Sequence, residues 1–461
     1  MGVEGRGPIL GQNNIMRLTV IGLGKLGAPM AAVMAHQGHT VVGVDLDPAR
    51  VDAVNHGRAP VREPGLEEMI RNHRARLTAT TSYAEAVAAT EITFIMVPTP
   101  SEAAGGFSLR HVLAAAQAIG PALGRQPDFH LVVLSSTVMP GATAGELLPA
   151  LEAASGKRCG RDFGLCYNPE FVALGSVIHD LLNPDMVLIG ESDERSGDLL
   201  AHLYRGLCES HPRISRMNFV NAELAKLSVN TYLTTKISYA NMLAEVCEKL
   251  PGADVEVVTS AIGCDTRIGG KYLQAALGYG GPCFPRDNLA FAALARGCGV
   301  EATLAEATHQ VNRRQAPRVS ELILSHLPEN GTAAILGLSY KPDTGVSEES
   351  QGLAVAQQLL ARGVRVMVYD PAAIPDARPH LVGHVVFAQS VEQCLREADV
   401  VAVTTPWAEF ESISPALLKR SGRRAVLLDC WRVLPRQEFG LVADYVTLGL
   451  GPQGAEGAGQ T

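Results

Sequence analysis

The residues best suited to chemistry lie in segment 278–287, which reads Gly-Tyr-Gly-Gly-Pro-Cys-Phe-Pro-Arg-Asp. Its three glycines and two prolines are unsuited to a helix interior and predict a shaped loop. Cys283 stands beside Arg286 and just before a helix expected to start near Asn288, with Asp287 near the N-cap. A helix N-terminus and a nearby cation both favour the thiolate. At this point a nucleophilic thiol and an inert, packed thiol both remain open.

A second candidate pair opens a long segment, 222–249, that contains neither proline nor glycine and is predicted to be one helix. Lys226 and Asn230 are spaced i, i+4 and share a face. Their neighbours in sequence are largely apolar, which indicates that this is not an ordinary solvated face. The alternative is a lysine that lays its aliphatic stem along the surface, beside a surface asparagine.

A dinucleotide site is predicted at the first strand, which leads into the turn Gly22-Leu23-Gly24-Lys25-Leu26-Gly27. In a G-x-G-x-x-G turn the first glycine permits the bend, the second admits a pyrophosphate, and the third allows close helix packing. Asp45 ends the second strand, where a carboxylate takes ribose hydroxyls and repels a 2′-phosphate, which favours NAD over NADP. Arg50, in a helix that Asp47-Pro48 should cap, is expected near the adenosine.

Two further strand ends carry short polar side chains. Pro98 and Thr99 follow one apolar run, and Ser136 and Thr137 follow the next. Ligands of α/β sheets bind at the carboxyl ends of strands, so these residues are expected to contact the cofactor. Ordinary turn chemistry is the alternative.

The elements that must position these residues form three blocks. Unalternating apolar runs at 17–21, 40–44, 91–97, 130–135 and 185–189 predict buried parallel strands between helices. Residues 218–326 have helical periodicity, and strands are predicted again at 333–338, 365–369, 400–404 and 425–428, with a helix at 351–362. The predicted fold is α/β: two Rossmann-like doubly wound parallel-sheet domains joined by a central helical domain with one long helix. The predicted boundaries are a flexible lead 1–14, an NAD-binding domain 15–210, a helical domain 211–327, a second α/β domain 328–449 and a disordered tail 450–461.

Composition excludes several classes of protein. The 461 residues carry a net charge of −8, so there is no basic field for nucleic acid or an anionic membrane. No apolar run reaches the roughly 18 residues of a membrane helix. The nine cysteines include no C-x-x-C pair, so no metal site and no disulfide framework are expected. A cytoplasmic protein is the expectation.

Taken together, these segments resemble the UDP-glucose/GDP-mannose dehydrogenase family of nucleotide-sugar dehydrogenases. The resemblance runs from about residue 16 to 446. It depends on the glycine turn, the Lys226/Asn230 helix and three motifs: Tyr-Asn-Pro-Glu-Phe at 167–171, the Cys283 segment, and Gly-Leu-Ser-Tyr-Lys-Pro-Asp-Thr at 337–344. It implies oxidation of a sugar C6 alcohol to a carboxylate by two NAD⁺ in succession, through a thiohemiacetal and then a thioester on Cys283.

The same resemblance implies the remaining roles. Lys226 and Asn230 would stabilise the oxyanion, Asp287 and a water on Thr137 would manage the first proton, and Glu170 would assist thioester hydrolysis. The positions that match nucleotide-sugar contacts, in addition to Glu170, Lys226 and Asn230, are Leu277, Gly278, Tyr279, Gly280, Tyr340, Lys341 and Arg432. Arg267 matches a residue contributed by the partner of a homodimer formed through the central helices.

Two departures and several alternatives accompany this interpretation. Leu174 stands where the family has a second glutamate, and Glu348 stands where it has an arginine near the cofactor pyrophosphate, which puts NAD affinity in question. UDP-glucose is the expected substrate, with TDP-glucose or another nucleotide sugar as the alternative. Rival functions are a single-step β-hydroxyacid-type dehydrogenase without a catalytic cysteine, and a non-catalytic NAD-binding regulatory protein.

Overall fold

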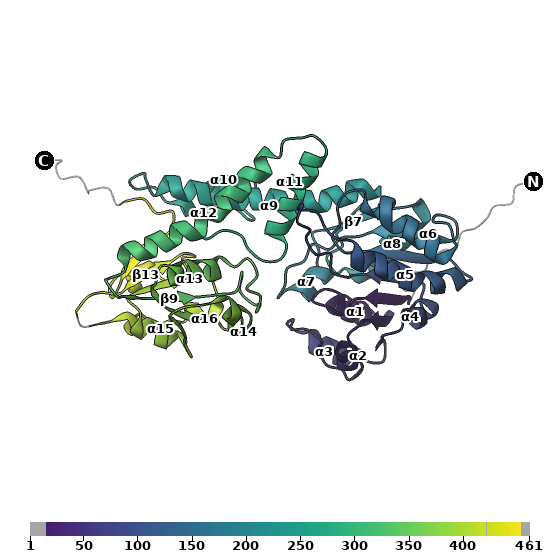
Figure 1. Ribbon diagram of the computed structural model, residues 1–461, viewed down its shortest axis with the longest axis horizontal. Coiled ribbons are helices and arrows are strands. Elements are labelled where there is room, and N and C mark those ends of the chain that lie inside the picture. The colour runs from purple at the N-terminus through teal and green to yellow at the C-terminus, as the bar shows by residue number, and fades with distance from the viewer. Residues whose placement is uncertain (1–14, 421, 453–461) are drawn as a thin grey trace, which may run out of the picture. The chain divides into compact units, whose positions relative to one another are not determined.

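A computed structural model describes residues 15–420 and 422–452 of the chain (Figure 1). The chain divides into two compact units, Met1–Lys226 and Leu227–Thr461, and the boundary falls inside helix α9 (Phe219–Cys247). The expected flexible lead 1–14 and the part of the expected tail from 453 onward lie outside the described residues. The part of that tail within the described range is hydrogen-bonded, since Gly451 N donates to Ala253 O and Gly252 N donates to Pro452 O.

The first unit is built on an eight-stranded sheet in the order β3-β2-β1-β4-β5-β6-β7-β8. Its strands are β1 (Arg17–Ile21), β2 (Thr40–Val44), β3 (Leu77–Thr80), β4 (Ile92–Ile95), β5 (His130–Leu134), β6 (Phe163–Tyr167), β7 (Met186–Glu191) and β8 (Arg213–Met217). Neighbouring strands are parallel except β6 and β7, which are antiparallel where Tyr167 faces Gly190. The sheet is parallel as predicted except at this pair, where the segment between the two strands contains one six-residue helix, α7 (Val177–Leu182).

Helices cover both faces of this sheet, so its strands are apolar on both sides. One core joins alternate strand residues to α1, α3, α7 and α8, and the other joins the intervening strand residues to α4, α5 and α6. In β5, for example, Leu131 and Val133 lie in the first core while Val132 and Leu134 lie in the second. The helices of this unit are α1 (Gly27–His36), α2 (Pro48–Asn55), α3 (Leu66–Asn72), α4 (Tyr83–Ala89), α5 (Arg110–Arg125), a π-helical turn (Thr143–Leu147), α6 (Leu148–Ser155), α7 and α8 (Glu194–Leu207).

The predicted helical block is confirmed. The long helix α9 has 29 residues, and it is followed by α10 (Val255–Gly263), α11 (Phe284–Gly297) and α12 (Thr303–His326). Beyond residue 226 these helices belong to the second unit. Figure 1 draws them in teal and green, the colours of residues that follow the first sheet and precede the second along the chain.

The second unit also contains a six-stranded parallel sheet in the order β11-β10-β9-β12-β13-β14. Its two cores place α12 and α13 on one face and α15, α16 and α17 on the other. The elements are β9 (Thr332–Leu336), α13 (Gln351–Ala361), β10 (Arg365–Tyr369), α14 (Ile374–Ala377), β11 (Val385–Phe387), α15 (Val391–Glu397), β12 (Val400–Val403), α16 (Ala408–Glu411), β13 (Val426–Asp429), α17 (Arg436–Phe439) and β14 (Asp444–Thr447), with short 3-10 turns at Arg378–His380 and Pro415–Leu418.

Over the described residues, no helix has both the length and the apolarity to cross a bilayer. Within the same residues, no group of three or more histidine, cysteine or acidic side chains has the arrangement of a metal site.

Candidate active site

The glycine turn between β1 and α1 has the geometry that its sequence predicts. Gly22 has φ +96°, and a Cβ there would lie 2.5 Å from the Met96 carbonyl oxygen. A Cβ on Gly27 would lie 1.8 Å from the carbonyl oxygen of Gly22, so this residue allows α1 to approach the turn. A Cβ on Gly24 would meet nothing nearer than the Arg50 guanidinium at 4.0 Å. The first and third glycines are thus required by the fold, and the second borders open space.

The N-cap residue of α1, Leu26, makes no side-chain capping bond. In the first turn Ala28 N donates to Gly24 O at 3.1 Å and Pro29 has no N–H, so donors for an anion have to come from the glycine turn itself. Asp45 is buried at the end of β2, where it accepts hydrogen bonds from Leu23 N at 2.8 Å and Asp47 N at 2.9 Å. Arg50 Nη1 lies 3.3 Å from Asp45 Oδ2. The open glycine, the uncapped helix and the carboxylate fit a pyrophosphate and a ribose, which are the parts of NAD that this half of a sheet binds.

The two polar strand ends are joined to each other. Thr99 Oγ1 donates to the Thr137 carbonyl oxygen at 2.7 Å, and Ser136 Oγ donates to the Val97 carbonyl oxygen at 2.6 Å. Pro98 is exposed, as are Lys25 and Leu26 in the glycine turn. The hydroxyl groups of Thr99 and Ser136 therefore hold these two loops together. That these residues contact the cofactor stays a prediction.

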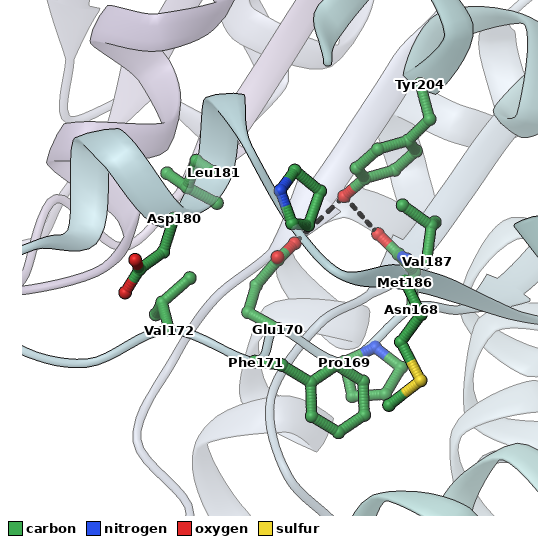
Figure 2. Close-up of a pocket in the computed structure, with 11 residues that line it drawn as sticks. Asn168, Pro169, Glu170, Phe171, Val172, Asp180, Leu181, Met186, Val187 and Tyr204 are labelled. Carbon is green, nitrogen blue, oxygen red and sulfur yellow. Dashed lines mark hydrogen bonds between the residues drawn. The ribbon is translucent and has the colours of Figure 1, made fainter. Parts of the chain in front are cut away.

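A second polar cluster lies beyond β6, in the Asn-Pro-Glu-Phe segment (Figure 2). Tyr204 of α8 has its hydroxyl 2.5 Å from Asn168 Oδ1 and 2.9 Å from Glu170 Oε1. Burial raises the pKa of Glu170 to about 7, while the charge of Lys226 acts in the opposite direction with smaller effect. These residues line a cavity of about 10 Å³, close to the space that one water molecule needs.

Lys226 is 9% exposed, so the prediction that it does not lie on a solvated face is confirmed. Its Nζ donates to the Glu170 carbonyl oxygen at 2.6 Å and lies 4.6 Å from the centre of the Phe171 ring. A buried ammonium attracts anions far more strongly than an exposed one, because water screens it less.

Two buried glutamates that sequence reasoning missed hold the loops of this unit. Glu223 of α9 accepts hydrogen bonds from Gly141 N and Thr143 N, in the loop that follows β5. Glu63 accepts from Gly175 N and Val177 N at the start of α7. Nothing in the sequence distinguished them from surface glutamates. The nearby Leu174 packs against the α1 core, which is where its side chain lies in place of a carboxylate.

The predicted start of the helix after Cys283 was wrong. Helix α11 begins at Phe284, with Cys283 as its N-cap residue, so Pro285 lies in the first turn. Proline is tolerated there because the first N–H groups of a helix have no intrahelical partner. The Cys283 side chain is exposed, as an attacking thiol must be, and it stands at the positive end of a 14-residue helix.

Asp287 is 1% exposed and lies inside the first turn of α11, where its N–H donates to the Cys283 carbonyl oxygen at 2.8 Å. Asn230 of α9 donates from Nδ2 to Asp287 Oδ2 at 2.6 Å, and Arg286 Nε lies 3.2 Å from Oδ1. The structure thus brings together Cys283, Asp287 and Asn230, three of the predicted catalytic residues.

The glycine-rich loop before Cys283 is fixed by three side-chain amides. Asn241 of α9 binds Leu277 O and Ala276 N, Asn312 of α12 binds both backbone groups of Tyr279, and Gln351 of α13 donates to Tyr279 O. A Cβ on Gly278 would lie 2.3 Å from Asn312 Oδ1, so this glycine is required by the packing.

The following glycines press against the loop between β9 and α13. Gly281 N donates to the Glu348 carbonyl oxygen at 3.0 Å, and a Cβ on Gly281 would lie 2.6 Å from the Tyr340 ring. A Cβ on Gly280 would lie 2.3 Å from the Glu349 carbonyl oxygen. Glu348 therefore supports this loop through its backbone, while its side chain is exposed. Lys341 is half-buried in the same loop.

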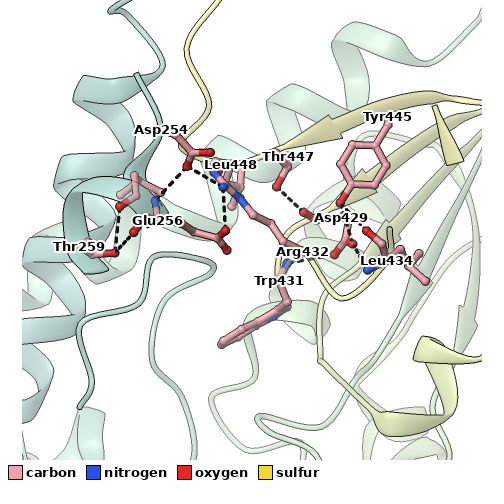
Figure 3. Close-up of polar contacts among 11 residues, drawn as sticks. Asp254, Glu256, Thr259, Asp429, Trp431, Arg432, Leu434, Tyr445, Thr447 and Leu448 are labelled. Carbon is pink, nitrogen blue, oxygen red and sulfur yellow. Dashed lines mark hydrogen bonds and ion pairs between the residues drawn. The ribbon is translucent and has the colours of Figure 1, made fainter. Parts of the chain in front are cut away.

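The two arginines predicted to contact the nucleotide sugar form ion pairs with acidic side chains. Arg267 is 86% exposed and forms a bidentate pair with Asp265. Arg432, which has φ +55°, places Nη1 2.6 Å from Asp254 Oδ1 and 3.2 Å from Glu256 Oε2 (Figure 3). Its Nη2 donates to the Leu448 carbonyl oxygen. Its charge therefore joins the end of the second sheet to the start of α10.

Comparison with known proteins defines the class to which this architecture belongs. Three family models match the chain: the NAD binding domain of the UDP-glucose/GDP-mannose dehydrogenase family over residues 16–208, its central domain over 220–314 and its UDP binding domain over 334–436. The chain belongs to this family, a family of nucleotide-sugar dehydrogenases, and its cofactor is NAD.

Individual relatives share the full architecture. A UDP-glucose 6-dehydrogenase of Haloferax volcanii is 38% identical over 92% of this chain and 98% of its own length. A GDP-mannose 6-dehydrogenase of Azotobacter vinelandii is 33% identical over 87% of this chain and 93% of its own length. The structure of a UDP-glucose dehydrogenase from Pyrobaculum islandicum superposes with a TM-score of 0.85 at 35% identity, covering 96% of this chain and 99% of that one.

Proposed function

We propose that the protein oxidises the C6 hydroxyl group of UDP-glucose to the carboxylate and reduces two NAD⁺ per sugar. The observation that carries the proposal is the exposed thiol of Cys283 at the N-terminus of α11, one turn before the buried carboxylate of Asp287. A single hydride transfer needs no nucleophile, whereas a second oxidation needs a tetrahedral adduct of the aldehyde, which a thiolate supplies. Similarity to UDP-glucose 6-dehydrogenases supports the choice of sugar nucleotide.

The chain's own residues divide the work. NAD⁺, when bound, accepts hydride from the sugar carbon. By family resemblance, Asp287 takes the proton of the alcohol with a water on Thr137. The thiolate of Cys283 then adds to the aldehyde carbon, and the negative oxygen that forms is stabilised by Lys226 and the amide of Asn230.

Loss of the second hydride leaves a thioester on Cys283. Water attacks its carbonyl carbon, the carbon–sulfur bond breaks, and Glu170 accepts the proton of the water. A carboxyl group whose pKa is about 7 suits this step, because near neutral pH it both takes up and releases a proton.

The test begins with stoichiometry and a sugar panel. We expect two NADH per UDP-glucose with UDP-glucuronate as product. One NADH per substrate would indicate a single-step dehydrogenase, and NAD binding without turnover of any sugar would indicate a regulatory protein. Comparison of kcat/KM for UDP-, TDP- and GDP-sugars decides the base, since a hydrogen-bonded ring edge discriminates by orders of magnitude.

Helix α11 provides a matched pair of variants. Cys283 is its N-cap residue and Cys298 its C-cap residue, and both thiols are exposed. Cys283→Ser should lower steady-state NADH formation by about a thousandfold or more, while Cys298→Ser should leave it unchanged. Full turnover in Cys283→Ser would exclude the thioester route.

We further propose that the enzyme is a cytoplasmic homodimer that pairs through α9, with Arg267 contributed to the partner's substrate. A row of exposed apolar side chains at helical spacing on α9 supports the pairing: Tyr232, Tyr239, Met242 and Val246. A reducing cytoplasm keeps the thiol of Cys283 available. Light scattering should give twice the chain mass, and Val246→Glu should halve it. A wild-type monomer would contradict the pairing.

A further inference from the structure

The cluster around Glu170 contains more hydrogen-bond acceptors than its protons can serve at once. Tyr204 has one hydroxyl proton, and two acceptors face it: Asn168 Oδ1 at 2.5 Å and Glu170 Oε1 at 2.9 Å. Figure 2 shows the hydroxyl between the two side chains. Tyr204 and Asn168 are 2% and 1% exposed, so the contact between their two oxygens depends on a proton of the cluster itself.

The orientation of the Asn168 amide decides where the proton goes. Its Nδ2 donates to the Leu188 carbonyl oxygen of β7 at 2.8 Å. Turning the amide over would place two carbonyl oxygens against each other, so Oδ1 has to face Tyr204. Two oxygens 2.5 Å apart need a proton between them. The Tyr204 proton is therefore directed to Asn168, and a lone pair of the Tyr204 oxygen faces Glu170.

We propose that Asn168 and Tyr204 are positioning residues that hold Glu170 in its protonated form before the hydrolysis step, with the carboxylic acid of Glu170 donating to the Tyr204 oxygen. This inference rests on the proposed function only for the use made of Glu170. In that reaction the acid first releases its proton to solvent. The carboxylate then takes a proton from the attacking water, and the carboxylic acid passes it to the departing sulfur of Cys283.

The other groups that face Glu170 agree with a protonated side chain. Lys226 of α9 donates from Nζ to the Glu170 backbone carbonyl oxygen, and its charge lowers the pKa of Glu170 by less than burial raises it. Asp180 of α7 lines the same cavity as a second acidic side chain and accepts from Ala173 N and Ser176 Oγ. Burial raises the pKa of the Cys208 thiol after α8 to about 12, so this thiol stays neutral.

The test removes the Tyr204 oxygen. If Tyr204 accepts the proton of Glu170, Tyr204→Phe deprives the acid form of its partner, and the pKa of Glu170 falls by about half a unit to one unit. The acid limb of the kcat–pH profile should then move to lower pH, and less thioester should accumulate at pH 6 when quenched enzyme is weighed by mass spectrometry. If Tyr204 instead donates to a carboxylate, the limb moves to higher pH. Either that result or no shift would overturn the proposal.

A readout without turnover separates this proposal from the proposed function. The infrared difference between wild type and Glu170→Gln should contain a carboxylic acid C=O band that titrates near pH 7, and in Tyr204→Phe the band should disappear at lower pH. These bands are expected even if the enzyme oxidises no nucleotide sugar. The control is Tyr445→Phe, which removes the hydroxyl that Tyr445 places 3.0 Å from Asp429 in the second unit and should leave the Glu170 band unchanged.

Discussion

The turn after β1 and the turn after β9 begin the two sheets with the same local geometry. Gly22 and Gly337 both have positive φ, +96° and +109°, and their N–H groups donate to Val44 O at 2.7 Å and Tyr369 O at 2.8 Å. In each unit a helix glycine then packs on the turn: a Cβ on Gly27 would lie 1.8 Å from Gly22 O, and one on Gly352 would lie 2.2 Å from Gly337 O.

The two turns differ in how the helix that follows each of them is capped. Gly27 begins α1 five positions after its turn glycine, and the first turn of α1 has no side-chain cap. Gly352 follows Gly337 by fifteen positions, and Ser350 caps α13 by accepting from Leu353 N. The N-terminus of α13 is therefore capped by a side chain, whereas that of α1 is not, although Ala28 N of α1 already donates to Gly24 O.

The carboxylates that end the second strand of each half-sheet show the same contrast. Asp45 accepts from two backbone N–H groups and lies beside Arg50. Asp370 is surrounded by donors: Oδ2 accepts from Leu338 N, Ser339 N, Ser339 Oγ and Trp407 Nε1, and Oδ1 accepts from Ala372 N and Ala373 N. A ribose would find no acceptor capacity on Asp370. The same fold thus binds a dinucleotide in one unit and in the other uses the equivalent groups to hold its own loop.

Alanine substitution of the helix glycines, Gly27 and Gly352, should give the largest difference between the two turns. Gly27→Ala places a Cβ against a backbone oxygen at the pyrophosphate turn, and overpacking of this kind costs about 1–3 kcal/mol. We expect the Kd of NAD to rise by about a hundredfold in Gly27→Ala, measured by calorimetry. Gly352→Ala should lower the melting temperature but leave NAD affinity unchanged. An equal loss of NAD affinity in both variants would show that the two turns do not differ in their contribution to NAD binding.

The strand-end carboxylates should give a smaller effect. Asp45→Asn removes the charge that repels a 2′-phosphate and leaves Arg50 beside it, so the ratio of NADP to NAD affinity should rise by about tenfold or more. Asp370→Asn should not change this ratio, because its donors belong to the chain, but it should lower the free energy of unfolding by about 3 kcal/mol. If Asp370→Asn changes cofactor preference, the second carboxylate is part of a cofactor site after all.

Much of this arrangement could be predicted from the sequence, because local patterns determined it. The strands Arg17–Ile21, Thr40–Val44 and Arg365–Tyr369 begin and end where their apolar runs do. The glycine turn and the Asp47 cap of α2 also follow from short-range chemistry. Strands β3, β6, β8, β11 and β14 lie outside the predicted runs. Strand β8 was missed because its residues, Arg-Ile-Ser-Arg-Met, give no apolar run.

What the sequence could not show was the partners of polar side chains that are distant in sequence. Glu223 reaches across about 80 positions to bind the loop after β5, and Tyr204 lies 34 positions from Glu170. Asp254 and Arg432, 178 positions apart, form an ion pair that no local pattern signals. Such contacts depend on the complete fold, so the motifs indicated candidate reactive residues but not the groups that hold and orient them.

The smallest predicted effect concerns the side-chain cap of α13, which α1 lacks. Ser350→Ala removes the cap of α13 and should lower the free energy of unfolding by about 1 kcal/mol. Ser82→Ala is the matched control, because Ser82 caps α4 of the first unit by accepting from Glu85 N at the same 3.3 Å. Hydrogen exchange should therefore rise at Leu353 in one variant and at Glu85 in the other. Calorimetry of Ser350→Ala should still show a single NAD per chain, because Asp370 remains saturated. A second NAD would mean that the cap alone keeps the dinucleotide out of the second sheet.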